Sequence, residues 1–259
     1  MRVLVCAKRV PAPGARINVT DDGLAVETAH LGFTTSPHEE CAVEQAVQVV
    51  DAVGGSVTVL TLGPSEAEEQ LRYAASVGAN ELVLVATDGS PWDPQRTAEA
   101  LAVAITELEA DGGRFDLVLF GNESADAGGY QVGIRVARHL RRPMVNGIKG
   151  LDLDGDNIVV RRPVDGGYEV YRLPLPAMVG VKEGINLPRY PTMRGRLASK
   201  KVELMTLTPD AEPGGQLMLR LSTPPETAVD TEVLGTADSD LDEVAVRVVD
   251  LLDELGVLS

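Results

Sequence analysis

Short apolar runs alternate with longer amphipathic stretches through the first two-thirds of the chain. Four runs rich in Val and Leu are typical of strands that helices cover on both faces, at residues 3–10, 56–63, 81–87 and 115–121. The stretches between them repeat apolar residues at helical spacing or open on Pro and acidic residues, which mark helix starts, at residues 41–53, 64–77 and 91–110. This order predicts an α/β fold with a doubly wound, mostly parallel sheet.

The pattern changes after residue 145. Turn signals at residues 154–156 and 165–167 separate alternating runs and predict added hairpins. Residues 177–182 and 201–207 predict further strands. Residues 209–238, rich in Pro and Gly, predict an extended arm, and residues 240–255 predict an amphipathic helix.

We therefore expect one α/β domain over residues 1–208, which includes the hairpins of residues 145–208. The extended arm and C-terminal helix then occupy residues 209–259. The apolar face of that helix must pack on its own domain or on a partner chain, and the pattern favours neither.

Composition limits the classes of protein and partner. The formal net charge of −16 disfavours nucleic acid as a partner, because a polyanion is repelled by a field of this sign. No apolar run approaches the ~18–20 residues of a membrane helix. Residues 1–7 run directly into a strand-like segment, so we expect no signal peptide, no membrane insertion and a cytoplasmic location. Cys6 and Cys41 are expected to be buried thiols rather than a disulfide or a metal pair.

Residues 182–201, which we call the basic segment, carry several Lys and Arg residues and a single acid, Glu183. Pro188 and Pro191 prevent it from being one continuous helix. Met193 and Leu197 are apolar residues among these charges. The segment is either an ordinary solvated loop or an apolar anchor ringed by charge, which is typical of a transient protein contact.

Ligands of doubly wound sheets sit at the carboxyl ends of the strands, so the loops after Val5, Leu62 and Phe120 are the candidates. The loop of residues 121–133 is small, polar and rich in Gly, which lets a backbone approach a phosphate ahead of a helix N-terminus. It matches neither of the common phosphate-loop fingerprints. No catalytic set or metal cluster stands out, which favours a binding or carrier role.

Two histidines are expected to be structural. His38 lies in a run from Ser36 to Cys41 that predicts a capped helix start with Pro37 at the first position. His139 lies at the end of a predicted helix, where a cation suits the dipole.

The chain resembles the β-subunit family of electron-transfer flavoproteins. The resemblance spans nearly the whole chain and is carried by residues 2–10, 40–46, 78–80, 186–191 with Lys200 and Lys201, and 160–170 with 176–179. It departs from the family signature at Tyr171 and Gly180.

This resemblance implies a Rossmann-like, adenine-nucleotide-binding fold and a heterodimer with an α subunit. The α subunit holds most of a FAD, and the β subunit binds a structural AMP and has no catalytic residues of its own. Electrons arrive from acyl-CoA or other flavin dehydrogenases and leave toward a quinone oxidoreductase or another acceptor. The alternatives are an electron-bifurcating relative with a second FAD here and NADH as donor, a stand-alone ATP-binding domain, or an enzyme such as a ligase on the same fold.

The resemblance also assigns residues to two sites. It gives the nucleotide pocket three groups near the strand ends, namely Cys6, Ala7 and Lys8; Ser36, Pro37, His38, Glu39 and Leu62; and Gly121, Asn122, Glu123, Ser124, Ala125, Asp126, Ala127, Gly128, Gly129, Tyr130, Gln131 and Val132. It gives partner docking to Tyr190, Pro191, Thr192, Met193, Arg194, Gly195, Arg196, Leu197 and Lys200. Met193 takes the anchor position, where Leu is common, and a flexible Met suits several partners. Residues 125–130 stand where the family has an acid-rich or Asp-Gly-Asp-Thr stretch, and the absence of the Asp-Gly-Asp-Thr run that the bifurcating relatives share favours AMP.

Overall fold

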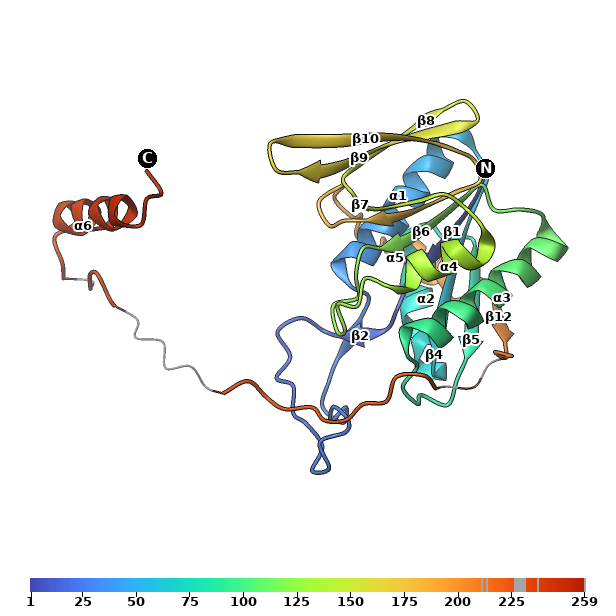
Figure 1. The fold of residues 1–259 in the computed structure, drawn as a ribbon, viewed down its shortest axis with the longest axis horizontal. Coiled ribbons are helices and arrows are strands. Elements are labelled where there is room, and N and C mark those ends of the chain that lie inside the picture. The colour runs from blue at the N-terminus through green and yellow to red at the C-terminus, as the bar shows by residue number, and fades with distance from the viewer. Residues whose placement is uncertain (211, 213, 226–231, 237, 259) are drawn as a thin grey trace. The chain divides into compact units, whose positions relative to one another are not determined.

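A seven-stranded parallel sheet organises the chain in the computed structural model, which describes residues 1–210, 212, 214–225, 232–236 and 238–258. The strand order is β12-β5-β4-β1-β6-β11-β7, and every neighbouring pair is parallel. The strands are β1 (Arg2–Cys6), β4 (Ser56–Gly63), β5 (Glu81–Ala86), β6 (Leu117–Gly121), β7 (Met144–Ile148), β11 (Ala177–Val181) and β12 (Leu204–Leu207). The predicted doubly wound α/β fold is confirmed (Figure 1).

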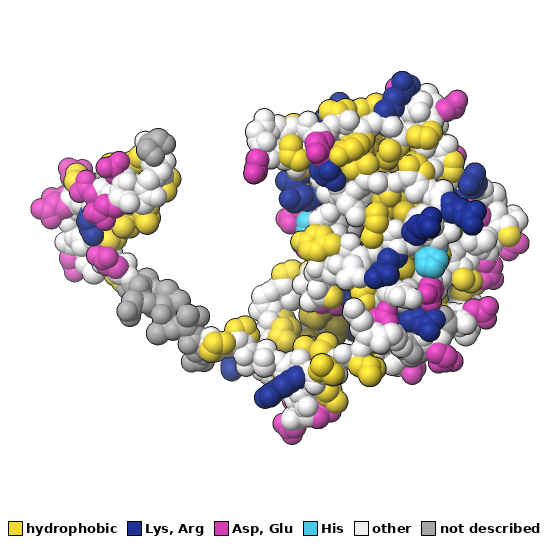
Figure 2. Space-filling view, in the orientation of Figure 1, with side chains coloured by type: hydrophobic (Ala, Val, Ile, Leu, Met, Phe, Trp, Pro, Cys, Tyr) yellow, Lys and Arg dark blue, Asp and Glu magenta, His cyan; other side chains and the backbone are white. Residues whose placement is uncertain are grey.

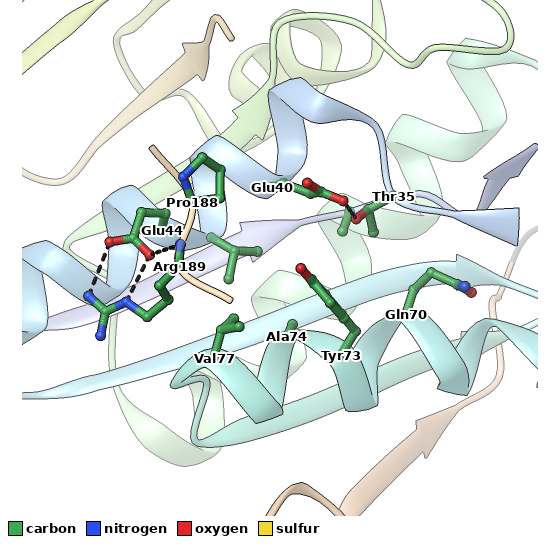
Figure 3. Close-up of a pocket in the computed structure, with 11 residues that line it drawn as sticks. Thr35, Glu40, Glu44, Gln70, Tyr73, Ala74, Val77, Pro188 and Arg189 are labelled. Atoms are coloured by element: carbon green, nitrogen blue, oxygen red, sulfur yellow. Dashed lines mark hydrogen bonds and ion pairs between the residues drawn. The ribbon is translucent and has the colours of Figure 1, made fainter. Parts of the chain in front are cut away.

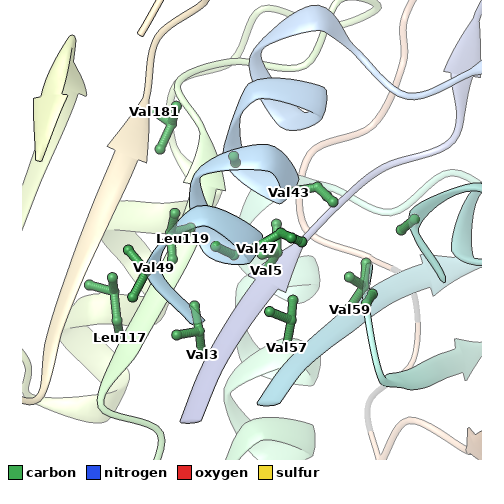
Figure 4. Close-up of a cluster of buried hydrophobic side chains, with 14 of the residues drawn as sticks. Val3, Val5, Val43, Val47, Val49, Val57, Val59, Leu117, Leu119 and Val181 are labelled. Carbon is green, nitrogen blue, oxygen red and sulfur yellow. The ribbon is translucent and has the colours of Figure 1, made fainter. Parts of the chain in front are cut away.

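Helices cover both faces of this sheet. Val3 and Val5 of β1 join the core beneath α1 (Pro37–Val53) and α2 (Glu68–Val77), where Figure 4 shows the side chains of α1 lying over the strands. Leu4 and Cys6 join the core beneath α3 (Pro94–Gly112) and α4 (Val132–Leu140). Successive residues of a strand point to opposite faces, so both faces must be apolar, which explains the nearly continuous Val and Leu runs.

Helix starts follow their caps. α1 begins at Pro37 after the N-cap Ser36, as predicted. The helix expected from Pro91 begins at Pro94 because the Asp93 carboxylate accepts hydrogen bonds from the N–H groups of Gln95 (2.6 Å) and Arg96 (3.0 Å). A single 3₁₀ turn, η1 (Ser65–Ala67), precedes α2.

α4 ends in a basic turn. Arg138 and His139 lie in its last turn, so His139 has the predicted place at a helix end. Lys and Arg side chains gather on this face of the molecule around α4 (Figure 2). Their positive charge offsets the negative end of the helix dipole.

Two strands differ from the sequence-based expectation. The predicted run over residues 3–10 is divided, because β1 ends at Cys6 and Val10 begins β2 (Val10–Pro11), which pairs with β3 (Phe33–Thr34). The backbone N–H of Lys8 bonds to the Glu39 carboxylate instead of continuing the ladder. β7 is not predicted at all, since Asn146 and Gly147 interrupt its apolar pattern.

The predicted hairpins form a separate three-stranded antiparallel sheet of order β10-β9-β8. Its strands are β8 (Gly150–Asp154), β9 (Asn157–Val164) and β10 (Gly167–Pro174), and β9 packs against β7 (Figure 1). The basic segment contains a short helix, α5 (Met193–Ser199), which begins beyond Pro191.

Contacts divide the chain into two units, Met1–Leu221 and Ser222–Ser259. The first unit extends past residue 208, since the Leu221 N–H donates to the Gly23 carbonyl oxygen (2.7 Å). In the second unit, α6 (Leu241–Glu254) follows its cap Asp240, as the amphipathic pattern predicts, and it buries none of its residues. Residues 211, 213, 226–231 and 237 of the predicted arm lie outside the described residues. Among the helices that the structure describes, none is long and apolar enough to span a membrane.

Candidate functional site

The predicted nucleotide-site residues come from segments that end at one edge of the parallel sheet. Cys6, the last residue of β1, pairs with Leu60 of β4 on one side and with Phe120 of β6 on the other. The loops that follow β1, β4 and β6 therefore leave the sheet side by side. Leu62 of β4 lies at the same edge and packs partly against the core beneath α3 and α4.

Side-chain contacts join three of the predicted segments into what we call the strand-end cluster. Lys8 Nζ lies 2.6 Å from Asp126 Oδ2. His38 Nε2 lies 3.1 Å from Glu123 Oε1, and the Ser36 hydroxyl donates to the Glu123 carbonyl oxygen at 3.3 Å. The loop after β1, the start of α1 and the loop after β6 thus meet in one polar cluster.

Glu39 is the buried acid of this cluster, with 6% of its surface exposed. Its Oε2 accepts a hydrogen bond from the Ser36 N–H at 3.0 Å, and the Lys8 N–H also donates to this carboxylate. Burial raises the pKa of Glu39 to about 7, although these hydrogen bonds oppose the rise. The carboxyl thus occupies the N–H of the N-cap Ser36 and the N–H of Lys8, which an external anion would otherwise use.

Gly121 is required by this arrangement. A Cβ at this position would lie 2.7 Å from Glu39 Cγ and 3.2 Å from His38 Cβ. Any larger residue would push the start of α1 away from β6 and open the strand-end cluster.

The loop of residues 124–131 leads to the second helix start at this edge. Gly128 and Tyr130 take left-handed φ angles of 53° and 54°, and the Tyr130 hydroxyl bonds to Glu123. A left-handed non-Gly residue costs roughly 1–2 kcal/mol, so this turn is imposed by its surroundings. Gln131, the N-cap of α4, makes no side-chain capping bond, which leaves the first-turn N–H groups of α4 available to an anion.

The charges around this helix start are balanced locally. Partial burial opposes ionisation of Asp126, but Lys8 holds the pKa of its carboxyl below the ordinary value. Lys8 remains partly exposed, so it can also approach a phosphate. An added Cβ at Gly129 would meet no atom within 4 Å, so there is open space beside the loop.

Cys6 and Cys41 are free and buried, as predicted. Burial raises the pKa of the Cys6 thiol, so this thiol stays protonated and is unreactive at neutral pH. Among the described residues no group of His, Cys, Asp and Glu side chains could hold a metal ion.

The basic segment presents apolar side chains to solvent. Tyr190 and Met193 are 89% and 76% exposed, and Leu197 is also exposed on α5. The Thr192 hydroxyl caps α5 by accepting a hydrogen bond from the Gly195 N–H at 3.0 Å. Arg194, Arg196 and Lys200 lie close to these apolar residues in the sequence, and the docking role of the segment stays a prediction.

One feature beside the basic segment escapes sequence reasoning. A cleft between α1 and α2 is lined by Glu40, Glu44, Tyr73 and Arg189, and Arg189 forms an ion pair with Glu44 there (Figure 3). Glu44 lies within the apolar, buried part of α1, and an acid at such a position is a signal that a partner cation is needed. The sequence gives no indication that this cation is Arg189.

Comparison with known protein families identifies a match over most of the chain. The family model described as "Electron transfer flavoprotein domain" matches residues 23–212. This range includes the start of α1, the loop after β6 and the basic segment.

Three bacterial proteins, each named "Electron transfer flavoprotein subunit beta", are similar over most of the chain. The chain is 33% identical over 214 residues to the protein of Thermoanaerobacterium thermosaccharolyticum, which covers 81% of this chain and 79% of that one. It is 35% identical over 212 residues to the Mycobacterium leprae protein, with coverages of 80% and 78%. It is 33% identical over 234 residues to the Syntrophomonas wolfei protein, with 90% of both chains covered.

Proposed function

Because the chain belongs to the electron transfer flavoprotein β-subunit family, we propose that it works as one half of a two-chain electron carrier. An α-type subunit holds most of a FAD, and this chain completes the site and docks the redox partner. The flavin supplies the one- and two-electron chemistry when it is bound. This chain's own residues bind, orient and dock, and no catalytic group of its own is required.

The observation that carries the proposal is the strand-end cluster, where three separate segments meet at one sheet edge. We propose that it holds AMP. The uncapped N-terminus of α4 and the ammonium of Lys8 suit a phosphate, and the open space beside Gly129 allows the backbone to approach it. Glu123 and Asp126 do not prevent this, because His38 and Lys8 lie against their carboxylates.

We further propose that Tyr190–Lys200 docks a flavin dehydrogenase, such as an acyl-CoA dehydrogenase. Exposed Tyr190 and Met193 supply the apolar contact, and the surrounding basic side chains supply orientation. The electrons then pass toward a quinone oxidoreductase or another acceptor.

The first test is to purify this chain together with an α-type subunit, release the bound nucleotides by denaturation, and count them by chromatography. One FAD and one AMP per heterodimer are expected. Two FAD and no AMP would assign the cluster to a second flavin, as in electron bifurcation with NADH. Recovery of a well-behaved single chain that binds ATP, with no flavin and no partner, would overturn the carrier proposal.

A further inference from the structure

Four apolar side chains within residues 187–197 are exposed, namely Leu187, Tyr190, Met193 and Leu197, and together we call them the docking face. Leu187 is 87% exposed and lies outside the range that the sequence assigns to docking. Side chains on a mobile loop must be ordered when they bind, which costs affinity. How firmly the surrounding backbone is held therefore decides how well this face can dock.

Arg189 fixes the backbone between Leu187 and Tyr190 of the docking face. Its Nε lies 2.8 Å from Glu44 Oε2 and its Nη2 lies 3.1 Å from Glu44 Oε1, which is a two-pronged ion pair (Figure 3). The backbone N–H of Arg189 also donates to Glu44 Oε2 at 3.1 Å. One carboxylate thus holds both the side chain and the main chain of the residue between Leu187 and Tyr190.

Glu44 is suited to act as this fixed point. It is 5% exposed and belongs to α1, which packs on the central sheet. Gln48 Nε2 donates to Glu44 Oε1 at 2.7 Å and sets the orientation of the carboxylate. Burial opposes ionisation, but the hydrogen bonds from Arg189 and Gln48 hold the pKa of Glu44 below its ordinary value, so the ion pair is formed at neutral pH.

The segment is held on both sides of this clamp. On one side, Asn186 Nδ2 donates to the Cys41 carbonyl oxygen at 3.0 Å. On the other side, Arg72 Nη1 donates to the Ser199 carbonyl oxygen at 2.8 Å, and an added Cβ at Gly195 would lie 2.3 Å from the Ser76 carbonyl oxygen, so α5 sits directly on α2. The backbone that carries the apolar side chains is therefore held at several points.

We propose that Glu44 and Arg189 are positioning residues, which hold the docking face in its binding conformation so that a dehydrogenase meets a preorganised surface. This inference rests on the docking role proposed above. It adds Leu187 to the contact surface. Lys cannot replace Arg189 fully, because it lacks the planar fork that engages both carboxylate oxygens.

The test uses the co-purified heterodimer. A substrate-reduced acyl-CoA dehydrogenase is mixed with it, and the rate at which the flavin of the heterodimer becomes reduced is measured. Glu44→Gln, Arg189→Gln and the double variant should each raise KM for the carrier about tenfold, with kcat and flavin content unchanged. The double variant should be little worse than Glu44→Gln, because the Glu44 carboxylate accepts from both the side chain and the backbone N–H of Arg189, while the Arg189–Asp51 ion pair (3.2 Å) adds only an exposed contact. Arg189→Lys should recover part of the loss.

Arg96→Gln is the matched control, since it breaks an Arg–Glu ion pair of similar length (2.9 Å) on α3 and should leave KM unchanged. If Glu44→Gln fails to fold, the KM of Arg189→Gln still tests the proposal, because the Arg189 side chain is exposed and its replacement should not prevent folding. An unchanged KM in Arg189→Gln, or losses that multiply in the double variant, would overturn the positioning role.

Met193→Ala separates this inference from the docking proposal beneath it. If Met193→Ala raises KM and Arg189→Gln does not, the docking face is real but needs no clamp. If neither variant changes KM, the docking proposal itself fails.

Discussion

Glu39 is the residue at which the strand-end cluster is most sensitive to pH. Its pKa rises from an ordinary value of 4.5 to about 7 because burial disfavours the charged carboxylate. The folded state therefore binds this proton more tightly than the unfolded state does. The contribution of Glu39 to stability is greatest below pH 4.5 and is lost as the pH rises to about 7.

We expect Glu39→Gln to remove this pH dependence. Between pH 4.5 and 7.5 the free energy of unfolding should fall by about 3 kcal/mol more in the native chain than in the variant, from the size of the pKa shift. Urea unfolding at several pH values measures it. Glu107→Gln, the same charge change at an exposed position of α3, should follow the native curve. Parallel curves for the native chain and Glu39→Gln would show that the carboxylate is ionised without penalty.

Met193 is the exposed residue for which a functional effect is expected without a structural one. Met193→Ala should leave thermal stability and flavin content unchanged, because the side chain is 76% exposed. It should slow electron transfer from the dehydrogenase several-fold, as loss of an interface anchor does. Met205→Ala, at a half-exposed position of β12, is the control. Loss of flavin from Met193→Ala would instead place this residue in the flavin site.

At the scale of elements, an Asp side chain caps both α3 and α6, and the two helices differ in how much of their surface is buried. The Asp93 side chain caps α3, which packs on the central sheet, and the Asp240 side chain caps α6, which buries none of its residues. Asp93→Ala should lower the free energy of unfolding of the first unit by about 1 kcal/mol. Asp240→Ala should not shift that transition. Urea unfolding, followed by the fluorescence of Trp92 beside the α3 cap, measures the unfolding transition of both variants. Equal shifts of the transition in Asp93→Ala and Asp240→Ala would mean that α6 is part of the same cooperative unit.

Local signals were sufficient for most elements, whereas the meeting of the loops after β1 and β6 follows from the parallel order of the strands. Pro37 after Ser36 predicts the α1 start, and the Asp-Gly turns predict the hairpins, because these residues act within a few positions of themselves. Strand β7 escapes prediction because its burial comes from its neighbour β11, and not from its own pattern. The Glu44–Arg189 pair escapes because a contact across so many residues depends on the tertiary fold.

At the scale of the whole molecule, the apolar face of the C-terminal helix needs a surface to pack on, and the sequence pattern does not identify that surface. On the apolar face of α6, Leu241 and Val248 are exposed, and Val244, Leu251 and Leu252 are only half-buried. An amphipathic helix of this length is marginal alone in water and needs a surface to pack on. We propose that this surface belongs to the α-type subunit.

Truncation after Leu221 tests this assignment. The first unit has its own sheet and both of its cores, so the shortened chain should keep its circular dichroism spectrum and its thermal midpoint to within a few degrees. It should lose most of its co-purification with the α-type subunit, because the helix and its arm are removed. A double substitution of Leu251 and Leu252 by Ser in the full chain should reproduce the loss without shortening the chain. A large fall in the thermal midpoint of the truncated chain, with partner binding retained, would instead mean that the helix packs on its own domain.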